Sequence, residues 1–137
     1  MAATFAFEIV SPERLLLSRP VEMAVIPAAE GEMGVLHGHA PMILSLSGGV
    51  ISVHEGGQVT ERLFVMGGFA EVTPTRVTVL AEEALPVAEI TKADAAKRVA
   101  DADAAYAAAV AAGDNAAREA AADRAIAARR MEAVAAG

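Results

Sequence analysis

The 137-residue sequence contains no cysteine and no tryptophan, and its aromatic residues are four phenylalanines and one tyrosine. Without cysteine the chain can form neither a disulfide nor a thiolate nucleophile nor a cysteine-ligated metal site. Five aromatic side chains are also few for a ligand pocket, because such pockets are lined mainly by apolar and aromatic groups. These absences argue against a disulfide scaffold and against a small-molecule site.

Long apolar runs are missing as well. No stretch of 18 or more apolar residues lacks charge, and the first eight residues show no basic region followed by an apolar stretch. We therefore expect no membrane-spanning segment, export signal or transit segment, and a bacterial source. Nine arginines against two lysines, together with abundant alanine, favour a GC-rich genome.

Positive charge is scarce in the first part of the chain. Residues 1–90 contain 4 Lys and Arg against 11 Asp and Glu, whereas residues 91–137 contain seven of each, so the net charge of −7 belongs to the first part. An acidic surface repels phosphate backbones and anionic lipid headgroups. Nucleic acid and the membrane surface are therefore poor candidates for partners, and a basic protein partner is favoured.

Composition changes sharply near residues 88–91. All six prolines and nine of the eleven glycines precede this point, and 23 alanines follow it. Alanine is the strongest helix former, whereas proline and glycine punctuate strands. We predict an α+β chain of two domains: a β-sandwich over 1–87 and a helical hairpin over 88–137.

The first domain has the pattern of short strands. Residues 4–10 alternate, with Phe5, Phe7 and Ile9 on one face. Pro20, Pro27 and Pro41 bound neighbouring runs, and three Gly-Gly pairs at 48–49, 56–57 and 67–68 are spaced like hairpin turns. The pattern predicts an N-terminal antiparallel β-sandwich of about eight to ten strands, including 15–17, 21–26, 42–46, 50–53, 59–65, 69–72 and 77–80.

The second domain has the signals of a C-terminal antiparallel two-helix hairpin. Thr91 can cap the first helix at Asp94, Gly113 can end it in a left-handed conformation, and Asp114 can cap the second helix. Large apolar residues are few, so the arm could be weakly docked and mobile, or held by a static alanine seam. Tyr106 is interpreted as a plug between the helices, and Arg129 and Arg130 as partners of the helix dipole.

The polar segment at 30–41 is the main candidate for chemistry. Glu30, Glu32, His37 and His39 are potential metal ligands or acid and base groups, but His54 is the only further histidine and there is no cysteine. Two glutamates two residues apart rarely bracket a sugar from opposite faces. No Gly-x-Ser-x-Gly elbow and no phosphate-binding loop occurs. A surface loop that contacts a partner is the favoured interpretation.

Five segments in register resemble one family. Residues 7–14, 30–34, 38–41, 67–72 and 77–82 are similar to the epsilon subunit of the F-type ATP synthase, called delta in mitochondria, and the similarity covers the whole chain in the same order. The resemblance implies a non-catalytic rotor subunit of the central stalk that links the gamma shaft to the membrane c-ring. It also implies peripheral association with the cytoplasmic face of a bacterial inner membrane, through the complex only, without cofactor or metal.

Site residues follow from the same resemblance. The partner-binding surface toward ring and shaft would contain Glu30, Glu32, Gly38, His39, Ala40 and Pro41. In many bacterial members the arm extends toward the alpha/beta catalytic head and inhibits ATP hydrolysis. This arm is neutral with scattered basic residues, so a regulatory arm and a permanently folded hairpin both stay open.

A nucleotide motif of the family, Ile/Leu-Asp-x-x-Arg-Ala, is degenerate here. The matching positions are Ile90, Thr91, Asp94 and Ala95, so both charged positions are lost and a carboxylate replaces the arginine. Since a carboxylate repels phosphate, we expect weak or absent ATP binding. Two other classes stay open from the residues alone: a free-standing β-sandwich ligand-binding module with a dimerisation arm, and a hydrolase that uses Glu30, Glu32 and His39.

Overall fold

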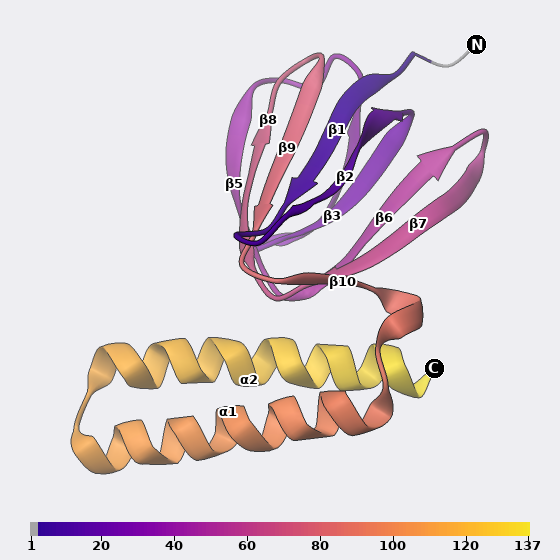
Figure 1. Cartoon of the computed structure of the whole chain (residues 1–137). Coiled ribbons are helices and arrows are strands. Elements are labelled where there is room, and N and C mark those ends of the chain that lie inside the picture. The colour runs from indigo at the N-terminus through magenta and orange to yellow at the C-terminus, as the bar shows by residue number, and fades with distance from the viewer. Residues whose placement is uncertain (1–2) are drawn as a thin grey trace. The chain divides into compact units, whose positions relative to one another are not determined.

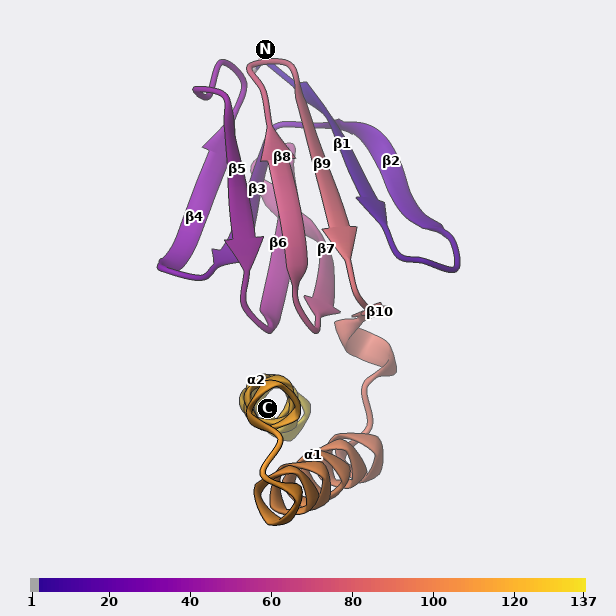
Figure 2. The ribbon, with the colours of Figure 1, turned by 90° about the vertical axis from the view of Figure 1, so that its left-hand side faces the viewer.

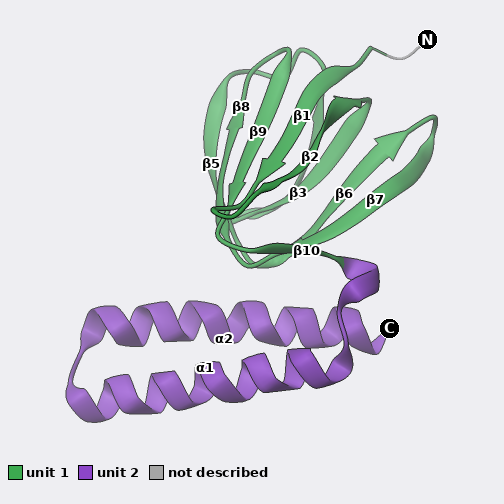
Figure 3. Cartoon of the chain, in the orientation of Figure 1, with its two compact units in different colours: residues 1–86 green, residues 87–137 purple. Residues whose placement is uncertain are grey.

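The computed structural model describes residues 3–137. The chain divides into two compact units, Met1–Pro86 and Val87–Gly137, coloured separately in Figure 3. Strands make up the first unit, and a short 3-10 helix followed by two α-helices makes up the second (Figure 1). The secondary structure changes where proline and glycine give way to alanine, as expected from the opposite helix propensities of these residues.

Ten strands form the first unit: β1 (Phe5–Val10), β2 (Leu15–Val21), β3 (Met23–Ala28), β4 (Gly31–Leu36), β5 (Met42–Leu46), β6 (Gly49–Glu55), β7 (Gln58–Val65), β8 (Gly68–Val72), β9 (Arg76–Ala81) and β10 (Ala84–Pro86). They hydrogen-bond in the order β10-β7-β6-β3-β5-β8-β9-β1-β2, and β4 pairs with β3 at the side. Figure 2 shows β5, β8, β9 and β1 side by side, with β3, β6 and β7 behind them. The two layers are linked through β3 and β5 by the single pair Ala28↔Leu46.

The predicted fold class, a β-sandwich followed by two helices, is confirmed. One pair departs from the antiparallel rule, because β1 runs parallel to β9 with Phe7 opposite Val77. Parallel neighbours need a long connection, and here most of the sandwich lies between the two strands.

The core lies between the layers. Phe5, Phe7 and Ile9 are buried while the residues between them are partly exposed, as the alternation in the sequence predicts. Phe5 and Phe7 also meet edge to face with ring centroids 6.1 Å apart. Other fully buried core side chains come from both layers: Val21, Ile26, Val35, Ile51, Val53, Val65, Val77 and Val79.

Two strands were missed in the sequence. Strand β4 lies inside the segment interpreted as a loop, and β10 follows the last predicted strand. Glycines at 31 and 34 lower the strand propensity of β4, and only Val35 in it is buried. A strand at the side of a sheet with one buried residue shows no alternation that could identify it.

Prolines and glycine pairs were partly misinterpreted. Pro20 lies inside β2, an end strand of the sheet path, and Pro27 lies inside β3, so neither bounds a strand. Only the pair 56–57 forms a hairpin turn, between β6 and β7, with φ of 59° and 75°. The pairs 48–49 and 67–68 connect strands that do not pair with each other and carry the chain between layers.

Those crossing glycines are required by close approach. A Cβ on Gly68 would lie 2.1 Å from the backbone oxygen of Leu80, and one on Gly49 would lie 2.8 Å from the Pro27 Cβ. Any residue other than glycine at position 68 would therefore displace the neighbouring strand β9.

The predicted helix signals are confirmed. Helix α1 (Lys92–Ala112) begins after Thr91, whose hydroxyl accepts the Asp94 N–H at 3.1 Å. It ends at Gly113 in a left-handed conformation, and Asp114 then caps α2 (Asn115–Ala136) through the Ala117 N–H at 3.0 Å. These caps satisfy backbone groups that helix ends otherwise leave unpaired.

The two helices pack against each other, and alanine makes up all of their buried residues except Met131. Ala95, Ala102 and Ala109 repeat every seven residues on α1, and α2 buries four alanines and Met131. Tyr106 is 41% exposed, so its interpretation as a plug is wrong. Alanine side chains leave the helices no space to fill with a phenol ring.

The dipole interpretation of the two neighbouring arginines is also wrong, since no basic residue lies in the last turn of α2. Arg129 instead crosses to α1. Its Nη2 donates to both carboxylate oxygens of Asp103, at 3.1 and 2.8 Å.

Candidate functional site

The structure separates the residues predicted to form one partner-binding loop. Glu30 lies in the turn between β3 and β4, Glu32 lies within β4, and 38–41 connect β4 to β5. The six residues of β4 cover about 20 Å. Glu30 and the 38–41 connection therefore lie at opposite ends of a strand and cannot form one small contact.

The connection 38–41 is itself well defined. The Gly38 N–H donates to the Pro74 carbonyl in the β8–β9 turn at 2.7 Å, and Gly38 takes a φ of 86°. His39 Nδ1 lies 2.9 Å from the Ala40 carbonyl, and its ring is partly exposed. Gly38, Ala40 and Pro41 are exposed, so this loop is open to a partner at the end of the sandwich.

The degenerate nucleotide motif lies at the start of α1. Ile90 is partly exposed, Asp94 is exposed and Ala95 is buried. Thr91 already uses its hydroxyl as the helix cap. The Asp94 carboxylate adds negative charge at this helix start, where a phosphate would otherwise be favoured.

An exposed apolar surface was missed in the sequence. On β5, β8 and β9, which lie side by side in Figure 2, Ile43 is 74%, Phe69 56% and Leu80 54% exposed. Phe69 pairs directly with Leu80, and Ile43 pairs with Glu71, which is two residues from Phe69 on the same face of β8. We call Ile43, Phe69, Glu71 and Leu80 the outer patch. Its signal was available as an interruption of the alternation, because Phe69 on β8 and Leu80 on β9 are apolar at outward positions where polar residues are expected.

Charges beside the outer patch are unequal. Glu8 on β1 forms an ion pair with Arg76 on β9. Glu71 is exposed, and its carboxylate has no hydrogen-bond or ion-pair partner among residues 3–137. The outer patch thus holds one carboxylate that residues 3–137 leave uncompensated.

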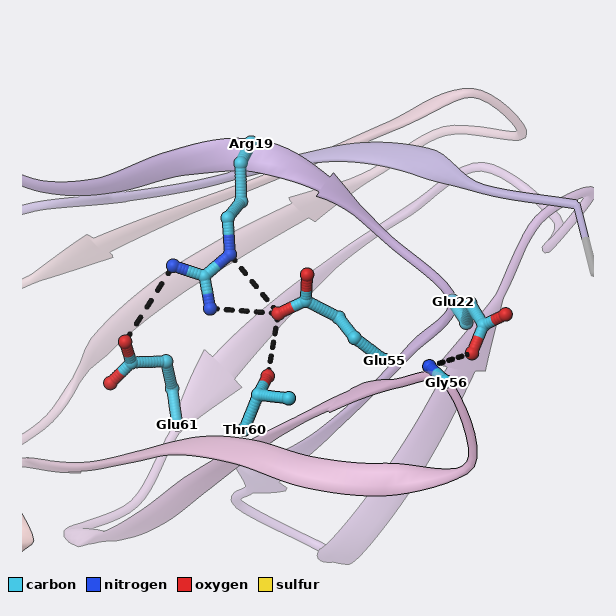
Figure 4. Close-up of polar contacts among 6 residues, drawn as sticks. All are labelled: Arg19, Glu22, Glu55, Gly56, Thr60 and Glu61. Atoms are coloured by element: carbon cyan, nitrogen blue, oxygen red, sulfur yellow. Dashed lines mark hydrogen bonds and ion pairs between the residues drawn. The ribbon is translucent and has the colours of Figure 1, made fainter.

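A polar cluster links β2 to β6 and β7 (Figure 4). Arg19 on β2 donates to Glu55 Oε1 on β6 at 3.1 Å from Nε and 2.7 Å from Nη2, and its Nη1 lies 3.6 Å from Glu61 on β7. Thr60 donates to the same oxygen of Glu55 at 2.5 Å. The hydrogen bonds from Arg19 first, and from Thr60 second, lower the pKa of the Glu55 carboxyl, and the bond to Glu55 raises the pKa of Arg19.

The arrangement does not assemble a catalytic or metal centre from the predicted residues. Within residues 3–137, no group of three or more His, Asp and Glu side chains is placed to hold a metal ion. Over the same residues, no helix has the length and apolar content that crossing a membrane requires. What the described surface offers is an apolar patch, an open loop and a helical hairpin.

Comparison with known proteins identifies the family. The model for the ATP synthase delta/epsilon chain β-sandwich domain matches residues 4–87. The chain belongs to the epsilon family of ATP synthase subunits. A family member named ATP synthase epsilon chain, from Granulibacter bethesdensis, is 66% identical over 105 residues, which are 77% of each chain. A second, from Paramagnetospirillum magneticum, is 54% identical over 102 residues, covering 73% of this chain and 77% of that one.

Solved structures agree with the family assignment. This epsilon-family chain matches, with a TM-score of 0.75 and 28% identity, a chain in the cryo-EM structure of the Euglena gracilis mitochondrial ATP synthase, OSCP/F1/c-ring in rotational state 1. The match covers 97% of this chain and 82% of the other. A Tetrahymena thermophila ATP synthase central stalk/c-ring chain shares the fold, with a TM-score of 0.55 and 10% identity over 65% of this chain and 71% of the other.

The family assignment confirms the resemblance seen in the sequence. It also makes the chain a non-catalytic subunit of the ATP synthase complex, in place of a free-standing ligand-binding module or a hydrolase.

Proposed function

We propose that this subunit acts in the central-stalk rotor and links the gamma shaft to the membrane c-ring of a proton-translocating ATP synthase. The observation that carries the proposal is the whole-chain likeness to a subunit of an assembly that contains F1 and a c-ring. In this role the chain would be a peripheral protein of a bacterial inner membrane. It would lie at the cytoplasmic face and be held there by the complex.

The outer patch is the proposed contact with the shaft. Ile43, Phe69 and Leu80 are large apolar side chains, and each is more than half exposed. They lie next to one another on β5, β8 and β9, because β8 pairs with both of the other strands. Burying such side chains against a partner stabilises a complex by about 25 cal/mol per Å² of apolar area, before the costs of association. Exposed apolar clusters of this kind mark interaction sites.

The loop 38–41 is the proposed contact with the ring. It is exposed, lies at one end of the sandwich and is braced by the bond between Gly38 and Pro74. Glu30 and Glu32 remain candidates for partner contacts, but Glu30, at the far end of β4, would touch a different surface from the loop.

The arm is proposed to work as a closed hairpin. Alanine faces allow close helix packing, and the bond between Asp103 and Arg129 joins the helices. Contact of the arm with the alpha/beta head would then involve its outer side. Removing residues 87–137 from the assembled enzyme should leave ATP hydrolysis within about twofold of the wild-type rate; a large increase would make the arm inhibitory.

Cross-linking tests the two contacts, because the chain has no cysteine of its own. Single cysteines at Leu80 and His39 should cross-link to gamma and to the ring subunit, respectively, in the assembled complex. A cysteine at Val59, which is 48% exposed on β7 in the other layer, is the control and should give neither product. If a tagged chain coexpressed with gamma forms no complex at all, the rotor proposal is wrong.

A further inference from the structure

We infer that Glu71 is a specificity-determining residue of the outer patch, and that it pairs with a cationic side chain, lysine or arginine, on the gamma subunit. The inference rests on the proposed contact between this patch and the shaft, and adds to it the chemistry of the partner surface.

The position of Glu71 carries the first step. On the outer face of β8 it stands between Ile43 on β5 and Thr78 on β9, with Phe69 two residues away on its own strand. Ile43 and Phe69 are among the most exposed large apolar side chains of the chain. A partner that covers these two residues also covers the Glu71 carboxylate, which adjoins both of them.

The second step concerns the charge that is already compensated. Glu8 and Arg76 share this face and form an ion pair, so the one arginine that β9 contributes is engaged. With Glu8, Glu71 and Arg76 counted together, the face keeps one negative charge. That charge belongs to Glu71, whose carboxylate has no partner within the described residues 3–137.

The third step is the cost of burial. An exposed carboxylate is stabilised by water, and covering it without a new partner costs several hydrogen bonds to water and its ionic solvation. A neutral, purely apolar partner surface would therefore be rejected at Glu71. A lysine or arginine replaces the lost water, and an arginine adds a planar donor pair that suits a carboxylate.

A structural role for Glu71 within the sandwich is not supported by its contacts. The side chain is exposed, and the cross-strand neighbours Ile43 and Thr78 are not charged. Substitution by glutamine should leave the isolated subunit folded, with an unchanged melting temperature.

The experiment measures the dissociation constant between the full-length chain and its gamma subunit for four chains: wild type, Glu71→Gln, Glu71→Lys and Phe69→Ser. Glu89→Gln is the matched control, because Glu89 is exposed, lies outside the sandwich strands and loses the same unit of charge. Each measurement is repeated at low and high salt, since an ion pair weakens with screening.

The expected result is a loss of about 30-fold or more in affinity for Glu71→Gln, a larger loss for Glu71→Lys, and no change for Glu89→Gln. A cysteine placed at position 71 first locates, by cross-linking, the cationic gamma residue that faces it. A charge-exchange pair should then restore binding: Glu71→Lys together with that gamma cation changed to glutamate. The wild-type complex should also weaken more steeply with salt than the Glu71→Gln complex.

The outcomes separate the two proposals. If Phe69→Ser weakens binding while Glu71→Gln binds like Glu89→Gln at both salt concentrations, the patch is the contact but the cation inference is overturned. If glutamine binds normally and only lysine fails, the partner at this position is a neutral donor, which also overturns it. If the wild-type chain, like Phe69→Ser, shows no binding to gamma above background, the proposed shaft contact itself is wrong.

Discussion

Arg19 on β2 and Glu55 on β6 are 36 residues apart, yet two nitrogens of the guanidinium donate to a single oxygen of the carboxylate. The two strands belong to different layers, which share only one backbone pair at the β3–β5 junction. The side chains of Arg19, Glu55 and Glu61 therefore add a polar link between the layers where β2 faces β6 and β7. A clamp of this kind fixes the distance between layers that are otherwise held by apolar packing.

The first prediction concerns pH. The pKa of Glu55 is lower in the folded chain than in the unfolded chain, so the unfolded state binds more protons in mild acid. The stability that this ion pair contributes is complete above the unfolded pKa and is lost as pH falls through the folded pKa. The melting temperature of wild type should therefore exceed that of Glu55→Gln near neutral pH, and the difference should shrink below about pH 5.

Glu71→Gln provides the control in the isolated chain. Its carboxylate has no partner in residues 3–137, so the difference from wild type should stay near zero across the same pH range. A gap between wild type and Glu55→Gln that widens on acidification would contradict the assignment of the clamp.

The second prediction concerns Gly68. Alanine at this position places a Cβ 2.1 Å from the Leu80 carbonyl and holds a left-handed φ of 135°, so Gly68→Ala should lower the free energy of unfolding by about 3 kcal/mol or more. Urea unfolding measures the change. Gly34→Ala is the matched control, because its Cβ would meet nothing closer than the Met23 sulfur at 3.8 Å. Equal losses in both variants would show that the close approach at Gly68 does not decide the cost.

The third prediction concerns the helical hairpin. Asp103 and Arg129 are about half exposed, so their bond should contribute only about 0.5–1 kcal/mol. Asp103→Ala, Arg129→Ala and the double variant form a cycle whose coupling energy, measured by urea unfolding, should fall in this range. A coupling energy of zero would mean that the alanine faces alone hold the helices together.

The fourth prediction concerns nucleotide binding. Isothermal titration should detect no ATP binding to the wild-type chain, whereas Thr91→Asp combined with Asp94→Arg should introduce it. Aspartate is also a good helix cap, so the start of α1 should persist in the double variant. Asp94→Arg alone is the control for charge. ATP binding by wild type as strong as by the double variant would show that the two positions do not decide affinity.

Much of this architecture could be predicted from local signals. The alternation at Phe5, Phe7 and Ile9 and the caps at Thr91, Gly113 and Asp114 depend on short-range physics, and all of these features are present in the structure. Strand β4 could not be found in this way, because its glycines and exposed side chains leave it without a pattern. Its pairing with β3 is a tertiary effect.

The candidate site was harder to predict for the same reason. A Gly-Gly pair forms a hairpin turn only where the strands on either side of it pair with each other. The spacing of the glycines does not determine which strands pair. The outer patch arises only when Ile43, Phe69 and Leu80, from three strands, come to one face. Glu30 and His39 looked adjacent because eight intervening residues without a strand would have allowed their side chains to meet.

The hydrogen bond between the Gly38 N–H and the Pro74 carbonyl has a mechanical consequence. It ties the exposed loop to the turn of the hairpin whose strands, β8 and β9, bear Phe69, Glu71 and Leu80. Strands are stiff along their length, so a force applied at the loop would be delivered to the outer patch with little local yielding. In a rotating assembly, the sandwich would then be a stiff connection between the partner bound at the loop and the partner bound at the outer patch. Elastic deformation would occur mainly in those partners.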